Sequence, residues 1–183
     1  MRKIVSGLFV SLDGIYESPH EWHFPYWSDE MGAVVQEQMS AADSLLLGRV
    51  GWQEFAQFWP QQPSDGEIAD HMNNTPKYVV SNTIDSVDEW QNSTLISGDV
   101  MTELRKLKEQ PGKDIGMSGS GTLVRSLLDA GLLDELRLLV HPIVVGKGKR
   151  LFPDGTPQLG LALTESETLP NGVLSLTYVK AAG

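Results

Sequence analysis

Residues 119–148 read GSGTLVRSLLDAGLLDELRLLVHPIVVGKG, and this stretch decides the fold class. Gly119-Ser120-Gly121-Thr122 has the composition of a tight turn, and apolar residues then recur at helical spacing as far as Leu128. Gly131 follows where a helix commonly ends. Residues 135–145 are the most strand-like run of the chain. A turn, a helix and a strand in this order are typical of an α/β protein.

The rest of the chain continues this alternation. Strands are expected at 4–11, 44–47, 77–81, 94–97, 114–118, 161–167 and 173–179, and helices at 29–39, 52–59, 100–107 and 123–128. The polar residues 61–74 are expected to form a loop, with or without a helical turn, and Pro142 to bulge its strand or place it at a sheet edge. The last two strands predict a hairpin around Pro170-Asn171-Gly172. We therefore expect one α/β domain over residues 1–183, with a mostly parallel central sheet, antiparallel C-terminal strands and flanking helices.

Composition excludes several classes of protein. Of 183 residues, 40% are hydrophobic and 21% charged, as in ordinary globular proteins. The formal net charge of −10 opposes binding to nucleic acid or to an anionic membrane. The chain has no cysteine, no apolar run long enough to span a bilayer and no signal-peptide-like start, so a cytoplasmic location is expected. The basic cluster Lys147-Gly148-Lys149-Arg150 fits a local anion site or a solvated loop, and the loop is the favoured interpretation.

Three expected strand ends carry residues suited to phosphate. In an α/β sheet, ligands bind beyond the carboxyl ends of the strands. There the turn at Gly119 brings backbone close to a ligand before a helix N-terminus, or simply packs strand on helix. Gly48-Arg49 offers a guanidinium beside another helix start, or a surface salt bridge. Ser81-Asn82-Thr83 offers small polar side chains, or caps a turn.

Longer motifs add a family resemblance. The segments are Leu47-Gly48-Arg49-x-x-Trp52, Lys77-Tyr78-Val79-Val80-Ser81, Gly119 to Leu123, Gly131 to Leu136, and Pro142 to Gly148, with Ser11 to Gly14 at the front. Together they resemble the dihydrofolate reductase superfamily, and within it the branch of the RibD C-terminal reductase domain. The resemblance covers almost the whole chain and implies a dihydrofolate-reductase-like three-layer fold.

The resemblance also implies a function: hydride transfer from NADPH to a small pterin- or aminopyrimidine-like heterocycle, similar to 5-amino-6-(5-phosphoribosylamino)uracil reductase. It places Gly48, Arg49, Val50 and Gly51 at the cofactor phosphates, Ser81 and Asn82 near the adenosine 2′-phosphate, and Gly119, Ser120, Gly121, Thr122 and Leu123 around the pyrophosphate. It further implies a cis bond between Gly119 and Ser120. Gly51 departs from the usual threonine of the motif, so only backbone donors remain there.

The proton donor is less well defined. The resemblance calls for a carboxylate at the first helix, where Asp29 and Glu30 stand, but both residues also suit a helix N-terminus. Asp13, at the end of the first strand, is an alternative that equally suits a turn. We carry Asp13 and Glu30 forward as candidate catalytic residues.

An aromatic segment, residues 18–28, is expected to cover the nicotinamide. Trp22 and Trp27 are candidates to stack on a planar substrate, or to fill a subunit interface. His20-Glu21-Trp22-His23 lacks the spacing of a helical zinc motif, so no metal is expected. Apolar surface on this segment and on residues 136–145 predicts a homodimer.

We therefore expect an NADPH-dependent reductase of a small heterocycle. Two other functions remain open at this point. One is a non-catalytic nucleotide-binding or sensing protein, and the other is a reductase that uses a flavin or deazaflavin.

Overall fold

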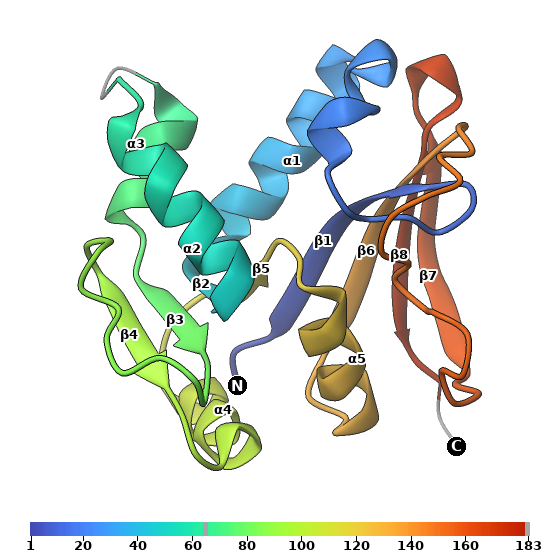
Figure 1. Ribbon diagram of the computed structural model, residues 1–183. Helices are drawn as coiled ribbons and strands as arrows, with labels where there is room; N and C mark the ends of the chain where they lie inside the picture. The colour runs from blue at the N-terminus through green and yellow to red at the C-terminus, as the bar shows by residue number, and fades with distance from the viewer. Residues whose placement is uncertain (64–65, 182–183) are drawn as a thin grey trace.

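An eight-stranded sheet runs through the molecule (Figure 1), in the order β4-β3-β2-β5-β1-β6-β8-β7. The computed structural model describes residues 1–63 and 66–181. The strands are β1 Ile4–Ser11, β2 Ala42–Gly48, β3 Lys77–Val80, β4 Ser93–Ile96, β5 Asp114–Met117, β6 Glu135–His141, β7 Leu161–Thr168 and β8 Leu174–Lys180. Strands β1 to β6 are mutually parallel, while β8 and β7 join as antiparallel strands. The expected mixed α/β sheet is confirmed.

Helices cover both faces of the sheet and complete three layers. They are α1 Asp29–Ala41, α2 Arg49–Phe58, α3 Glu67–Asn74, α4 Val100–Glu109 and α5 Gly121–Asp129. Alternate residues of β2 show the division: Leu46 belongs to the apolar cluster under α4 and α5, whereas Leu47 belongs to the cluster under α2 and α3. Helix α1 lies on the same face as α2, above β5 and β2. None of the described helices combines the length and apolarity needed to cross a membrane.

Helix α3 occupies the second half of residues 61–74, where a loop with at most a helical turn was expected. Residues 64–65 of this range lie outside the described residues. The buried Lys77 of β3 donates from Nζ to the carbonyls of Met72 (2.8 Å) and Asn73 (3.2 Å), which end this helix. The same ammonium lies 4.2 Å from the ring centre of Trp90, and burial lowers the pKa of Lys77 to about 8. A cation at the C-terminus stabilises a short polar helix, and a local sequence pattern does not reveal that partner.

Strand β6 is shorter than expected and lies inside the sheet. It pairs with β1 on one side and β8 on the other, so Pro142 ends the strand and does not mark an edge. Both edges of β6 are therefore paired and Leu136 and Leu139 are buried, while Val144, in the loop that follows, stays exposed. The C-terminal hairpin is confirmed, with Asn171 and Gly172 at positive φ (61° and 79°) in its turn.

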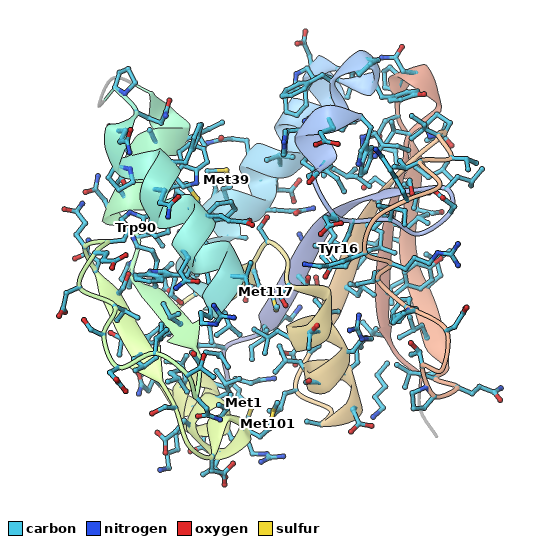
Figure 2. The ribbon with its side chains drawn as sticks, viewed as in Figure 1. Met1, Tyr16, Met39, Trp90, Met101 and Met117 are labelled. Atoms are coloured by element: carbon cyan, nitrogen blue, oxygen red, sulfur yellow. The ribbon has the colours of Figure 1, made fainter. Side chains whose placement is uncertain are left out.

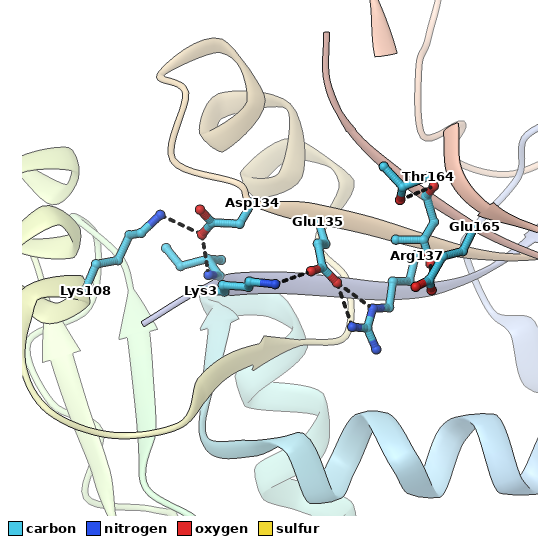
Figure 3. Close-up of polar contacts among 9 residues, drawn as sticks. Lys3, Lys108, Asp134, Glu135, Arg137, Thr164 and Glu165 are labelled. Atoms are coloured by element: carbon cyan, nitrogen blue, oxygen red, sulfur yellow. Dashed lines mark hydrogen bonds and ion pairs between the residues drawn. The ribbon is translucent and has the colours of Figure 1, made fainter. Parts of the chain in front are cut away.

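Charged side chains hold the amino ends of β1 and β6 together (Figure 3). Asp134 accepts hydrogen bonds from the backbone nitrogen of Ile4 (2.7 Å) and from Lys108 Nζ of α4 (2.6 Å). Glu135 accepts from Lys3 (2.7 Å) and from Arg137 (2.6 Å). Asp134 and Glu135 belong to the segment Gly131 to Leu136, which carries part of the family resemblance. Their role is structural, because they lie at the opposite end of the sheet from the expected ligand site.

Candidate functional site

The chain reverses its winding direction between β2 and β5. After β2 it continues outward to β3, whereas after β5 it crosses β1 to reach β6. Such a reversal leaves a crevice at the carboxyl ends of the two strands, where α/β proteins bind ligands. The turns that follow β2 and β5 touch there, because a Cβ added to Gly48 would lie 3.3 Å from Cβ of Ser120.

Two helices begin at this crevice from opposite faces of the sheet. Gly48 precedes α2 and offers no side chain to cap it, so the first backbone N–H groups of α2 have no side-chain acceptor there. Ser120 precedes α5, and its Oγ accepts from the backbone nitrogen of Leu123 at 3.4 Å. Two helix N-termini at one point form a site for an anion. Sequence analysis predicted both turns, and the structure brings them together.

The turn at Gly119 has room for a ligand on one side only. Gly119 has a φ of +82° with open space around its Cα, and its bond to Ser120 is trans, which corrects the expected cis bond. Gly121 is buried instead: a Cβ there would lie 2.6 Å from Cε1 of Tyr16. The cradle suited to a pyrophosphate is therefore at Gly119, while Gly121 accommodates a tyrosine.

The other expected cofactor residues lie along the same edge of the sheet. Arg49 and Val50 are exposed at the start of α2, and Arg49 Nη1 donates to Gln53 Oε1 at 3.0 Å. Thr122 is exposed at the start of α5, whereas Leu123 is buried in the core, so only its backbone faces the turn. Gly51 has open space around its Cα.

Ser81 and Asn82 are already engaged in turns. Ser81 is buried and its Oγ accepts from the backbone nitrogen of Thr83 at 3.1 Å. Asn82 is exposed and accepts from the backbone nitrogen of Gly98 at 2.7 Å through Oδ1. The amide Nδ2 of Asn82 therefore points away from that bond and is the better placed donor of the two residues.

Asp13 ties two loops together. Its carboxylate accepts from Ser11 Oγ (2.5 Å) and from the backbone nitrogens of Val145 (3.1 Å) and Gly146 (2.8 Å). These hydrogen bonds, that of Ser11 first, lower the pKa of Asp13 to about 2. Glu30 is exposed in the first turn of α1, and no described residue makes a hydrogen bond with it. The geometry favours a structural role for Asp13 and leaves Glu30 free to act as an acid.

The two tryptophans of the aromatic segment differ in exposure. Trp22 is 6% exposed and donates from Nε1 to the carbonyl of Glu17 at 3.2 Å. Trp27 is 43% exposed and lies against Gly32 of α1. Trp27 is therefore accessible to a planar ligand, whereas Trp22 packs in the interior.

His23 of this segment and His141 of β6 form a buried pair. The rings of His23 and His141 are 6.0 Å apart and perpendicular, and both also pack against Phe9. Burial lowers the pKa of each histidine. In the described residues, His23 Nδ1 and His141 Nε2 have no hydrogen-bond partner. Across the same part of the chain, no three His, Asp or Glu side chains are grouped to hold a metal ion.

Tyr16 and Arg125 were not predicted from the sequence. A pocket of about 530 Å³ lies beside α5, and both side chains line it together with Thr122, Gly148, Lys149, Arg150, Pro153 and Asp154. Figure 2 shows Tyr16 directly above α5. One tyrosine in a loop and one arginine in a helix form no recognisable sequence motif. That both line one pocket becomes apparent only when the loops after β1 and β6 are placed beside α5.

Comparisons with known proteins agree with this architecture. The family described as "RibD C-terminal domain" matches residues 2–175. The uncharacterized protein YyaP of Bacillus subtilis is 31% identical over 181 residues, which cover 97% of this chain and 94% of YyaP.

Two solved structures share the fold. A diaminohydroxyphosphoribosylaminopyrimidine deaminase/5-amino-6-(5-phosphoribosylamino)uracil reductase from Thermotoga maritima superposes with a TM-score of 0.66 at 16% identity, over 98% of this chain and 57% of that one. Dihydrofolate reductase from Enterococcus faecalis, in complex with NADP(H), also gives 0.66, at 12% identity over 98% and 97% of the two chains.

Proposed function

The chain belongs to the RibD C-terminal domain family, and from this membership we propose that it is an NADPH-dependent reductase of a small pyrimidine- or pterin-like heterocycle. The observation that carries the proposal is the meeting of Gly48 and Ser120, each preceding a helix, at the point where the sheet reverses direction. Two structural neighbours are named as reductases, and one of them holds NADP(H). Both facts support a dinucleotide in this crevice.

Specific residues would hold the cofactor. The N-terminal N–H groups of α2 and the open turn at Gly119 suit the pyrophosphate, because backbone donors can approach it without side chains in the way. The Arg49 guanidinium and the Asn82 amide suit the 2′-phosphate, since both are exposed at the same edge. When bound, NADPH supplies the hydride.

The remaining tasks fall to the chain itself. Glu30, whose carboxyl is free, is the proposed proton donor, and the exposed Trp27 is the proposed stacking surface for the heterocycle. The buried Trp22 and the partly exposed Asp13 would hold the loops in position around them.

A cofactor titration tests the proposal. NADPH, NADH, FMN and FAD are each titrated into the protein with tryptophan fluorescence as the readout, and we expect NADPH to bind tightest. NADPH oxidation is then followed at 340 nm against a panel of pterins and aminopyrimidines. Turnover of one compound supports the reductase. NADPH binding without turnover across the panel would favour the sensing protein, and preferential FMN or FAD binding would favour the flavin-dependent enzyme.

A further inference from the structure

The pocket beside α5 is separate from the crevice between β2 and β5. It lies between the loop after β1, the outer side of α5 and the loop after β6. Of the expected cofactor residues, only Thr122 lines it. The two sites are therefore neighbours that share Thr122 and otherwise have different walls.

Backbone hydrogen bonds fix the basic segment that forms one wall. The nitrogen of Tyr16 donates to the carbonyl of Lys149 (3.1 Å), and the nitrogen of Leu151 donates to the carbonyl of Gly14 (2.9 Å). Ile15 and Arg150 form an antiparallel bridge between these bonds. The segment is thus an exposed loop, as favoured from the sequence, and these bonds hold its backbone in a defined position.

Gly148 shows how closely the two loops approach. It has a φ of +111°, and a Cβ there would lie 3.1 Å from Cγ2 of Ile15 and 3.2 Å from Oε2 of Glu17. Only glycine combines this conformation with this distance. The close packing of Gly148 on the loop after β1 therefore sets the positions of its neighbours Lys149 and Arg150.

Positive charge dominates the lining. Arg125, Lys149 and Arg150 face one lining carboxylate, Asp154. Lys149 Nζ also lies 3.3 Å from Glu17 Oε1, while Arg125 and Arg150 make no ion pair within the described part of the chain. An uncompensated pair of arginines in a chain of net charge −10 indicates a local site for an anion.

The Arg125 guanidinium is oriented by the protein. Nη1 donates to the carbonyl of Leu151 (2.7 Å) and Nη2 to Oγ1 of Thr122 (3.2 Å). A guanidinium has five N–H donors, so others remain for a ligand. Holding the group in place in advance lowers the entropic cost of binding.

We propose that this pocket is a second anion site that binds a phosphate-type dianion. A phosphate group carries a charge near −2 and accepts several hydrogen bonds, which matches two arginines, a lysine and the hydroxyls of Tyr16 and Thr122. The dianion has two sources of the same chemistry, free phosphate and a phosphate monoester on a small metabolite.

Binding of inorganic phosphate and of ribose 5-phosphate, at constant ionic strength, tests the site. Amide chemical shifts of the ¹⁵N-labelled protein report position, and we expect the largest changes at residues 147–151 and at Thr122. Tighter binding of ribose 5-phosphate identifies a monoester as the ligand, and tighter binding of inorganic phosphate identifies the free ion. Shift changes confined to Gly48 and Gly119 would overturn the proposal.

Three charge-removing variants complete the test. Arg150→Gln and Arg125→Gln are expected to weaken phosphate binding at least tenfold, whereas Arg105→Gln, an exposed change on α4, removes the same charge and leaves it unchanged. Arg125 also supports Leu151, so Arg150→Gln, judged at an unchanged melting temperature, is the decisive variant. Equal affinities for all three variants would reject the site.

A last titration separates this site from the proposed cofactor site. Phosphate is added to protein saturated with NADPH, and we expect its affinity to be unchanged. Loss of phosphate binding under these conditions would assign the pocket to the cofactor and reject a second site. Normal NADPH binding with no phosphate binding would reject only the second site and leave the proposed reductase intact.

Discussion

The ring of Tyr16 rests directly on Gly121, so that a Cβ added to Gly121 would lie 2.6 Å from Cε1 and 2.8 Å from Cζ of that ring. Gly121 is the first residue of α5, and its φ is not in the left-handed region. Close packing, and not backbone conformation, therefore requires glycine here. The contact joins the loop after β1 to the helix after β5, between the crevice and the basic pocket.

Replacing Gly121 with alanine should destabilise the protein through this contact. The added methyl group overlaps the ring, and overpacking of this kind costs about 1–3 kcal/mol. In a Tyr16→Ala background the same methyl group meets no ring, so the double variant should lose less stability than the sum of the single variants, by at least about 0.5 kcal/mol. Urea unfolding of the four proteins measures this coupling. Strict additivity would show that the two residues do not interact.

Gly119→Ala is the matched control for that cycle. At a φ of +82° an alanine is strained but meets no atom within 4 Å, and left-handed strain costs about 1 kcal/mol or slightly more. Because this strain does not involve the ring, the loss should be the same in the wild-type and Tyr16→Ala backgrounds. A smaller loss of unfolding free energy in the Tyr16→Ala background would indicate that this substitution loosens the whole turn. The coupling at Gly121 could then not be ascribed to a specific contact with the ring.

Arg49→Ala should change cofactor preference without changing stability. The side chain is exposed and bonds only to Gln53 among the described residues, so the free energy of unfolding should move by less than about 0.5 kcal/mol. A hydrogen bond to a charged group contributes about 1.5–3 kcal/mol, so the Kd for NADPH should rise about tenfold to hundredfold. The Kd for NADH, measured in parallel, should hardly change. Equal losses of affinity for NADPH and NADH would place Arg49 at the pyrophosphate. Gln53→Ala is the control, because it removes the same Arg49–Gln53 hydrogen bond and keeps the guanidinium.

Much of the fold could be predicted because its signals are local. The mostly apolar, buried run of β1 and the apolar stripe of α5 each reflect burial of one element against its neighbours. The turn at Asn171-Gly172 needs positive φ, which its two residues favour. Helix α3 was predicted as no more than a helical turn, because the residue that stabilises it, Lys77, lies on the next strand.

The site was only partly predictable, because each of its residues suits either ligand binding or a structural role, and the sequence does not distinguish the two. Gly119 and Gly121 look alike in the chain, yet one faces open space and the other faces Tyr16. Asp13 suits both a turn and an acid, and only the approach of the loop after β6 shows where its oxygens bond. Burial likewise separates Trp22 from Trp27.

Acid should destabilise the protein through its buried histidines. Burial lowers the folded-state pKa of His23, His71 and His141, so below about pH 6.5 the unfolded chain binds protons that the folded protein does not. Stability should be complete above that pH and fall as the pH drops toward 5, by up to about 1.4 kcal/mol per pH unit for each histidine.

One substitution assigns part of that slope. His141→Gln should make the fall between pH 7 and pH 5 shallower, whereas His20→Gln, at an exposed position on the same segment as His23, should not. Urea unfolding at several pH values provides the comparison. An unchanged slope for His141→Gln would show that this histidine is protonated equally in both states.

The protein is expected to be a homodimer, so light scattering at micromolar concentration should give twice the 20.1 kDa chain mass. The ground is exposed apolar side chains: Phe24 of the aromatic segment is 63% exposed, and Val144 of residues 136–145 is 67% exposed. Leu12, also 67% exposed, lies on a loop that is joined to the loop of Val144 by a hydrogen bond from Leu12 N to the carbonyl of Ile143. Val144→Glu should therefore yield monomers. Leu163→Glu, which changes another exposed apolar residue, on the edge strand β7, should not, and a monomeric wild-type protein would contradict the expectation.

Substitutions of Asp13 and Glu30 should distinguish the roles of the two residues, because one should impair stability and the other the reaction rate. The lowered pKa of Asp13 means that its carboxylate stabilises the fold above about pH 3.8 and loses that effect as the pH falls toward 2. Asp13→Asn should therefore lower the melting temperature at pH 7 and flatten the acid-unfolding profile below pH 4, because a neutral amide accepts the two backbone N–H groups less strongly.

Glu30→Gln should leave the melting temperature unchanged, since no described residue bonds to this exposed side chain. If Glu30 delivers the proton, its variant should lose hydride-transfer rate, while Asp13→Asn, assayed well below its transition, keeps it. A rate that collapses in Asp13→Asn at an unchanged melting temperature would reverse the assignment and make Asp13 the acid.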